Sequence, residues 1–393
     1  MLTNDVVPRI ARDPIASYAG EVFCAIPRVD QRRWAEVYLR GLLSVPGKKS
    51  VRKIAESILA TPAHQSLQQF INQSPWRWGP VRAVLARYVQ SVAPPRAWVL
   101  SRVVIPKRGD RSVGVGRQFL PEAGRLVNCQ IGLAASIVTD DASVPVNWRI
   151  LLPKSWGSTE IRESAGIPDH VETRPQWLEA ADMVREMADR WALMPAPIVA
   201  DMRHLGRADE LVAELATQDD VAFVLEVDQA LAEAAGAGLL PQPRPRADFP
   251  LRPLETVIRA GRGLSALTGH RRHTVPPASP AARHTFVRSS LAKIPMPNGA
   301  PPRIARLLTE MSPDGEPARF WVTNLMSHRV DDVMALARLE ARARDGIQKL
   351  DRHFGLRDFE GRSFRGWHHH MTMVSAASVF AHVGWDALEA CAC

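Results

Sequence analysis

Cysteine is scarce in this chain of 393 residues, and long apolar runs are absent. The cysteines form no C-x-x-C pair, so we expect neither a disulfide framework nor a zinc site; they are Cys24, Cys129, Cys391 and Cys393. No uncharged stretch approaches the ~20 apolar residues of a membrane-spanning helix, and the first residues lack the apolar core of a secretory signal. We therefore expect a soluble protein of a reducing cytoplasm, with no membrane partner.

Acidic residues are fewer than basic ones. The chain has 50 Lys and Arg against 41 Asp and Glu, a formal net charge of +9. Such an excess favours a polyanionic partner, and the planar guanidinium group of arginine suits phosphate. An arginine-rich composition without functional meaning is the alternative.

The residue composition and the predicted secondary structure change several times along the chain. Residues 1–95 have helical periodicity and a basic turn, which is typical of a DNA-binding domain and equally of a plain helical subdomain. Residues 96–232 begin with a strand and a meander, continue with a helix over 174–191, and include the short strand PIVAD that ends at Asp201.

The second half of the chain starts with an unusual composition. Residues 233–315 are rich in Pro, Gly, Arg and His, which predicts an insertion or a flexible lobe. Residues 316–393 return to a strand at 318–325, a long helix at 330–354 and an apolar helix that starts near Trp367. This order predicts an α/β (α+β) fold, with a mixed sheet flanked by helices.

Several words of the sequence are distinctive, among them GVGRQF (114–119), GRLVNCQIG (124–132), LPKSW (152–156) and GRSFRGWHHHMT (361–372). With these words the chain resembles the DDE-type insertion-sequence transposases, in the subgroup with Tyr–Arg–Glu–Lys signature helices. The resemblance implies a ribonuclease-H-like fold and a site in which three carboxylates hold two divalent ions for DNA cleavage. It also implies DNA as a partner and a homodimer.

This sequence has only one of the three carboxylates at the positions that the family pattern predicts. The second acid falls on Asp201 and is present, but the first falls on Ser101 and the third on Arg344. The lysine that follows the third acid becomes Asp351. An arginine in the place of a ligand puts a cation where a divalent ion would sit, which costs ~1 to several kcal/mol. We therefore expect a transposase-like protein that has lost two-metal cleavage, and we expect no cofactor.

Two alternatives stay open. The fold is recruited for other chemistry, on a small-molecule or carrier-bound substrate, in a pocket around Ser101 and Asp201. Otherwise the protein is an active, Mg²⁺-dependent nuclease whose third acid has shifted along the helix, where Glu340 and Asp345 are near. Supporting candidates for the site, apart from Asp345, are Glu360, His368 and His369. In a repurposed enzyme a histidine near Asp201 would be a candidate base.

Several basic residues are candidates for contacts with nucleic acid. They are Lys48, Lys49, Arg52, Lys53, Lys107, Arg108 and Lys154. The run of histidines from His368 to His370 does not predict a metal site, because consecutive residues of a helix point in three directions. Cys129 is expected to be a buried, inert thiol.

Overall fold

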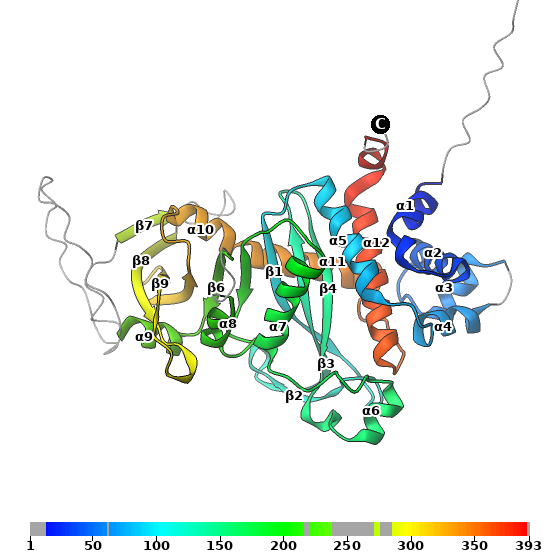
Figure 1. Ribbon diagram of the computed structural model, residues 1–393, viewed down its shortest axis with the longest axis horizontal. Helices are drawn as coiled ribbons and strands as arrows, with labels where there is room; N and C mark the ends of the chain where they lie inside the picture. The colour runs from blue at the N-terminus through cyan, green and yellow to red at the C-terminus, as the bar shows by residue number, and fades with distance from the viewer. Residues whose placement is uncertain (1–12, 61–62, 216–220, 238–270, 276–284, 391–393) are drawn as a thin grey trace, which may run out of the picture.

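The computed structural model describes residues 13–60, 63–215, 221–237, 271–275 and 285–390 (Figure 1). Five helices precede the first strand and form a layer at one end of the molecule. Their bounds are α1 Pro14–Val22, α2 Val29–Ser44, α3 Val51–Ile58, α4 His64–Asn72 and α5 Trp78–Val92. The prediction of helices over the first 95 residues is confirmed for the part that the structure describes.

The strands form one mixed sheet. They are β1 Ala97–Pro106, β2 Gly116–Leu120, β3 Arg125–Val138, β4 Ser143–Leu151, β5 Ile198–Asp201, β6 Phe223–Val227, β7 Arg271–Val275, β8 Thr285–Ile294, β9 Arg303–Met311 and β10 Pro317–Thr323. Their order is β2-β3-β1-β5-β6-β10-β9-β8-β7, and β4 also pairs with β3. Strands β1, β5 and β6 run parallel, whereas the other pairs are antiparallel. The expected mixed sheet flanked by helices is confirmed.

The remaining helices cover the two faces of this sheet (Figure 1). They are α6 Thr159–Ala165, α7 Gln176–Arg185, α8 Ala208–Leu215, α9 Gln229–Ala237, α10 Val330–Ala337, α11 Leu339–Phe354 and α12 Phe364–Ala390. Trp148 of β4 donates to Ser375 of α12, while the next residue, Arg149, pairs with Glu186 beyond α7. Because neighbouring residues of a strand point to opposite faces, α12 and α7 lie on opposite sides of the sheet.

The region 233–315 is more regular than its composition suggests. Strands β8 and β9 pair over nine residue positions, from Phe286 with Met311 to Ile294 with Arg303, and β9 pairs with β10. Alternating apolar residues of these strands are buried, including Val287 and Leu307. This part therefore extends the central sheet and is not a loosely packed lobe. Residues 238–270 and 276–284 lie outside the described residues, and the domain boundaries stay predictions.

Two further elements differ from the expectation. The long helix of residues 330–354 is interrupted at Arg338 and forms α10 and α11. The apolar helix begins at Phe364, three residues before the expected start at Trp367.

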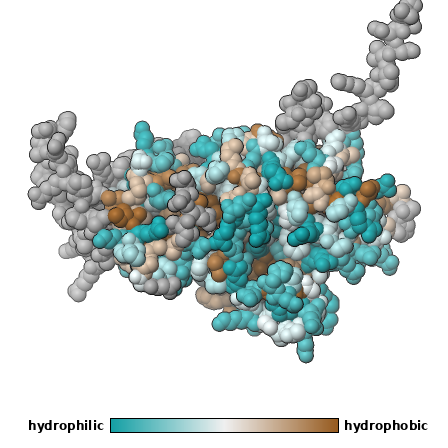
Figure 2. Space-filling view, in the orientation of Figure 1, coloured by the Kyte–Doolittle hydropathy of each residue, from teal (hydrophilic) through white to brown (hydrophobic). Residues whose placement is uncertain are grey.

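Most of the visible face is hydrophilic, with hydrophobic residues in small separate areas (Figure 2). Among the described helices, none combines the length and the apolar character that a membrane crossing requires.

Gly346 lies in the middle of α11, where the helix crosses β4. A Cβ atom at this position would lie 2.8 Å from the backbone oxygen of Ser143. Alanine normally stabilises a helix interior by about 1 kcal/mol relative to glycine, but here the overlap with backbone outweighs that gain. We expect Gly346→Ala to lower the free energy of unfolding by roughly 1–2 kcal/mol in urea denaturation.

Gly20 of α1 is the matched control, because a Cβ atom there would have no atom within 4 Å. Gly20→Ala should leave stability unchanged or raise it slightly. Equal effects of the two substitutions would show that α11 does not pack on β4 as closely as described.

Candidate active site

Three polar residues stand side by side on one face of the parallel strands. Leu100 of β1 pairs with Ala200 of β5, so the next residues, Ser101 and Asp201, are neighbours. Asp201 in turn pairs with Glu226 of β6. An acid therefore stands near the carboxyl end of each of the strands β5 and β6, and a serine of β1 stands beside Asp201. This is the edge where ligands of open α/β sheets bind.

A single arginine binds both acids of this row. Arg203 follows β5 by two residues, and its guanidinium donates to both carboxylate oxygens of Asp201, at 2.9 and 2.7 Å. The backbone N–H of Arg203 donates to the same carboxylate at 3.1 Å. A third guanidinium nitrogen lies 3.0 Å from a carboxylate oxygen of Glu226. The cation between the acids is thus part of the protein.

Glu226 is the most deeply buried acid of the group, with 3% of its surface exposed. It also accepts two hydrogen bonds from Arg319 of β10, at 2.9 and 2.6 Å. Two arginines therefore satisfy both oxygens of Glu226, as a carboxylate buried this deeply requires.

The pKa of Asp201 reflects the same arrangement. Burial raises this pKa, but the hydrogen bonds and the positive charge of Arg203 outweigh burial and hold it below the usual value. Asp201 is therefore ionised at neutral pH. Asp201, Glu226 and Glu340 all raise the pKa of Arg203, so three carboxylates act on one guanidinium.

The third expected position lies one turn away from the acid that faces the site. Arg344 of α11 is largely exposed and forms an ion pair with Glu340, four residues earlier. Glu340 is 8% exposed and is the acid of α11 whose charge acts on Arg203. Asp345 points away and pairs with Lys349, and Asp351 pairs with Arg357.

Ser101 contributes a hydroxyl group that has no partner. The residue is 7% exposed, and among the described residues none forms a hydrogen bond with its Oγ atom. A neutral hydroxyl group is a weak ligand for a hard divalent ion compared with a carboxylate.

The expected histidines lie elsewhere in the fold. His368, His369 and His370 are all buried and bond three different sets of partners, which are Arg82, the backbone near Trp76, and Tyr38 with Gly355. Burial lowers the pKa of His369 to about 3 and that of His370 to about 4. The histidine whose charge acts on Asp201 is His204, which the sequence analysis did not single out.

Cys129 is fully buried, and burial raises the pKa of its thiol, as expected for an unreactive cysteine.

The expected basic residues converge from distant parts of the chain. Lys107, at the end of β1, donates to the backbone oxygen of Phe359 at 2.7 Å, and Lys48 forms an ion pair with Glu360. The bound Glu360 raises the pKa of Lys48, and the nearby charge of Arg108 partly opposes that rise. We call Lys48, Lys107 and Arg108 the basic cluster. It lies beyond the end of β1, about 17 Å along the strand from Ser101 at the usual rise per residue.

Many of the expected basic side chains already have partners within the protein. Lys49 bonds the backbone oxygen of Val45, and Arg52 pairs with Glu56. Three of the seven candidates are exposed and have no side-chain partner among the residues described, namely Lys53, Arg108 and Lys154.

This geometry does not fit two divalent ions. In the described chain, no three side chains of His, Cys, Asp or Glu gather closely enough to hold a metal ion. The guanidinium of Arg203 is bound to Asp201, and the residues expected at the places of the first and third acids, Ser101 and Arg344, carry no carboxylate.

A comparison with models of protein families shows which family the chain belongs to. The model described as DDE superfamily endonuclease matches residues 21–250. The chain belongs to the DDE superfamily endonucleases. No curated protein matches the chain significantly. The family implies DNA as substrate and typically a divalent ion such as Mg²⁺, so the resemblance inferred from the sequence words is confirmed at the level of the DDE superfamily.

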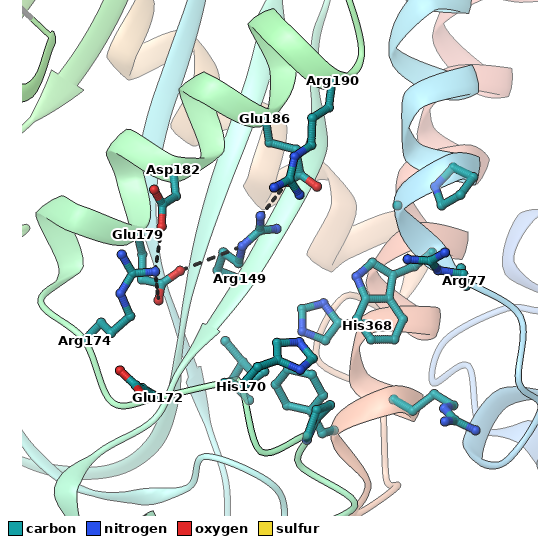
Figure 3. Close-up of a pocket in the computed structure, with 18 of the residues that line it drawn as sticks. Arg77, Arg149, His170, Glu172, Arg174, Glu179, Asp182, Glu186, Arg190 and His368 are labelled. Atoms are coloured by element: carbon teal, nitrogen blue, oxygen red, sulfur yellow. Dashed lines mark hydrogen bonds and ion pairs between the residues drawn. The ribbon is translucent and has the colours of Figure 1, made fainter. Parts of the chain in front are cut away.

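The larger of two cavities in the described part of this DDE superfamily protein is not at Asp201. It has a volume of about 860 Å³ and lies between α5, β4 and the end of α7 (Figure 3). A second cavity of about 520 Å³ lies between the loop after β1 and α6. Neither is lined by Ser101 or Asp201.

The sequence analysis missed Arg203, Glu226 and Arg319. A signal for one of them was present, because Glu226 is the one charged residue within the apolar strand VAFVLEV. A charge in a buried strand requires a partner. The identity of that partner depends on the register of β6 with β10, which the sequence does not give.

We expect Arg203→Gln to raise the pKa of Asp201, because burial remains while the compensating charge is lost. In the wild type the pKa is lowered, so ionisation of Asp201 stabilises the fold above pH ~4, and this contribution disappears as pH falls through the lowered pKa. The variant should lose about 1 kcal/mol near pH 7 and less under acidic conditions. Carboxyl ¹³C NMR and thermal unfolding across pH would measure both effects.

Arg207→Gln is the matched control. Arg207 pairs with Asp209 two residues away, as Arg203 pairs with Asp201, but it is more exposed. It should change stability little and leave the titration of Asp201 unchanged. A pKa of Asp201 that does not move in Arg203→Gln would contradict the compensation described here.

Proposed function

We propose that this member of the DDE superfamily binds DNA without cutting it. One observation carries the proposal: the guanidinium of Arg203 occupies the space between Asp201 and Glu226, where a divalent ion would have to bind. A metal ion at this point would face a positive charge a few Å away, which costs ~1 to several kcal/mol.

The alternative of a shifted third acid has a specific basis in Glu340. This acid faces Arg203 from the buried side of α11, one turn before the expected position. Glu340, Asp201 and Glu226 already share Arg203, however, and Arg319 and Arg344 add two further cations. These three carboxylates and three guanidinium groups balance in charge without an added ion, which favours loss of cleavage over a relocated site.

DNA binding rests on charge and on the fold. The basic cluster and the three unpaired basic residues Lys53, Arg108 and Lys154 would meet phosphates, and the net charge of +9 supplies long-range attraction. Neither alternative substrate class, small-molecule or carrier-bound, has a described cavity at Ser101 and Asp201 to support it.

The cleavage part of the proposal is tested with supercoiled plasmid. The wild type should produce no nicked product with Mg²⁺ or Mn²⁺, because its site lacks two ligand carboxylates. The divalent ions should also leave its melting temperature unchanged. Nicking that requires a divalent ion and disappears in Asp201→Ala would overturn the proposal and establish a shifted site that includes Glu340.

The binding part is tested through salt dependence. We expect duplex DNA affinity to fall steeply between low and moderate salt, with a logarithmic slope that loses about one unit in each of Lys53→Gln, Arg108→Gln and Lys154→Gln. Arg28→Gln is the control, because Arg28 is exposed but already paired with Asp30. Affinity that does not respond to salt, or equal slopes in all variants, would show that these residues do not contact phosphates.

A further inference from the structure

The 860 Å³ cleft borders an unusual piece of backbone. After α7 the chain continues as a π-helical turn, Glu186–Arg190, and Ala192 then adopts a φ of 50°. Ala192 is the one non-glycine residue with positive φ in the described part of the chain. Such turns and strained residues concentrate at functional sites. Three residues of the turn, Glu186, Asp189 and Arg190, line the cleft.

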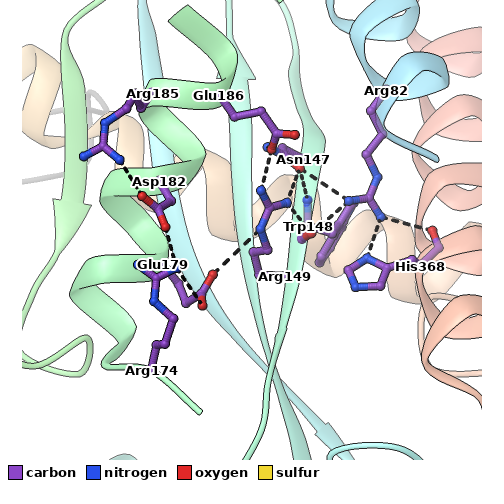
Figure 4. Close-up of polar contacts among 10 residues, drawn as sticks. All are labelled: Arg82, Asn147, Trp148, Arg149, Arg174, Glu179, Asp182, Arg185, Glu186 and His368. Atoms are coloured by element: carbon purple, nitrogen blue, oxygen red, sulfur yellow. Dashed lines mark hydrogen bonds and ion pairs between the residues drawn. The ribbon is translucent and has the colours of Figure 1, made fainter. Parts of the chain in front are cut away.

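Behind the cleft lies a fully buried arginine that fixes the state of a histidine. Arg82 of α5 donates to Asn147 Oδ1, to the backbone oxygens of Trp148 and His368, and to His368 Nδ1 at 3.2 Å (Figure 4). It also donates to Thr372 Oγ1. Arginine only donates, so Nδ1 of His368 must be the acceptor and the ring proton must sit on Nε2. Burial, with the charge of Arg82, keeps the ring neutral by lowering its pKa.

The Nε2–H group of His368 is a donor without a partner. The residue is 2% exposed and lines the cleft, and no described residue bonds this nitrogen. The ring of Trp78, which also lines the cleft, stacks on the imidazole of His368. The two ring centroids are 4.4 Å apart, and this stacking holds the imidazole in place. A donor held in this position in the wall of a cavity is available to an acceptor atom of a ligand.

Most charges around the cleft cancel in pairs. Arg149 binds Glu186 and lies 3.8 Å from Glu179, while Arg174 and Arg185 both bind Asp182 at 2.6 Å (Figure 4). These pairs leave the acids along α7 with little capacity for a cationic ligand.

The charged groups that remain at the cleft are the carboxylates of Glu172 and Asp189 and three arginines, of which Arg365 donates to the backbone oxygen of Gln73. Arg77 and Arg190 line the cleft and have no partner among the described residues (Figure 3). Arg77 precedes α5, a helix of 15 residues whose first N–H groups receive no side-chain cap. Trp78, Gly79 and Pro80 of that first turn also line the cleft. An uncapped helix N-terminus beside an arginine favours an anion.

We propose that this cleft binds a phosphate monoester, as carried by a free nucleotide or by the 5′ end of a DNA strand. The phosphate oxygens accept from the α5 N-terminus, Arg77, Arg190 and His368 Nε2–H, while the half-buried indole of Trp78 offers an apolar wall to the rest of the ligand. The site lies at the edge strand β4, between α5 and α12 on one side and the turn after α7 on the other, apart from Asp201. It does not depend on the DNA-binding proposal above, since a free nucleotide would occupy it equally well.

Isothermal titration calorimetry of the full chain tests this site. The probes are inorganic phosphate, deoxyadenosine monophosphate, and one short single-stranded oligonucleotide with either a 5′-phosphate or a 5′-hydroxyl end. We expect the monophosphate and the 5′-phosphorylated strand to bind, and Arg77→Gln and Arg190→Gln each to weaken binding about fivefold through loss of a charge-assisted hydrogen bond. Both arginines are exposed, so both variants should fold.

Arg33→Gln is the control, an exposed arginine of α2 that does not line the cleft. It should bind like the wild type. Preference for the phosphorylated strand over the free nucleotide would identify a DNA end as the source, and the reverse would identify a metabolite; both support the site. No binding of any phosphate monoester, or equal affinity for the 5′-phosphate and 5′-hydroxyl strands, would overturn it. So would cleft variants that bind like Arg33→Gln.

Discussion

The buried guanidinium of Arg82 joins three parts of the chain that are far apart in sequence. It projects from α5 and bonds both β4 and α12. Removing a charge from water costs several kcal/mol unless hydrogen bonds replace the lost hydration. The elements must therefore stay in register, because a shift of α12 would strand Arg82 without acceptors. The helical layer, the sheet edge and the last long helix form one body for this reason.

At the carboxyl end of β5 the buried charges are negative, and they too need compensation within the protein. There the acids are buried, and a guanidinium supplies the compensating charge. Arg203 binds Asp201 and Glu226 together. Carboxylates that hold a metal ion receive their compensating charge from that ion, whereas Asp201 and Glu226 receive it from Arg203. An internal cation of this kind stabilises buried carboxylates without a bound ion.

The sequence predicted the architecture well, because periodicity and the family words identify strands β1 to β6, α7 and α11 directly. It also predicted a pocket around Ser101 and Asp201 from the family pattern, but it did not give the pairing of β1 with β5 that makes them neighbours. The role of Arg203 could not be predicted from the sequence, because an exposed arginine after a strand has no distinctive sequence pattern. Glu340 was seen only as a neighbour of Arg344, because the direction in which a helix presents a residue depends on how the helix packs. The order in β8 and β9 was underestimated, because composition does not register pairing between distant segments.

Glu226 binds arginines from two different parts of the sheet. Arg203 holds it from the end of β5, and Arg319 holds it from β10, whose other edge carries β9 and then β8. Glu226 therefore connects the end of β5 with the outer strands through two ion pairs, although β8 and β9 contribute no residue to the pairing of Arg203 with Asp201.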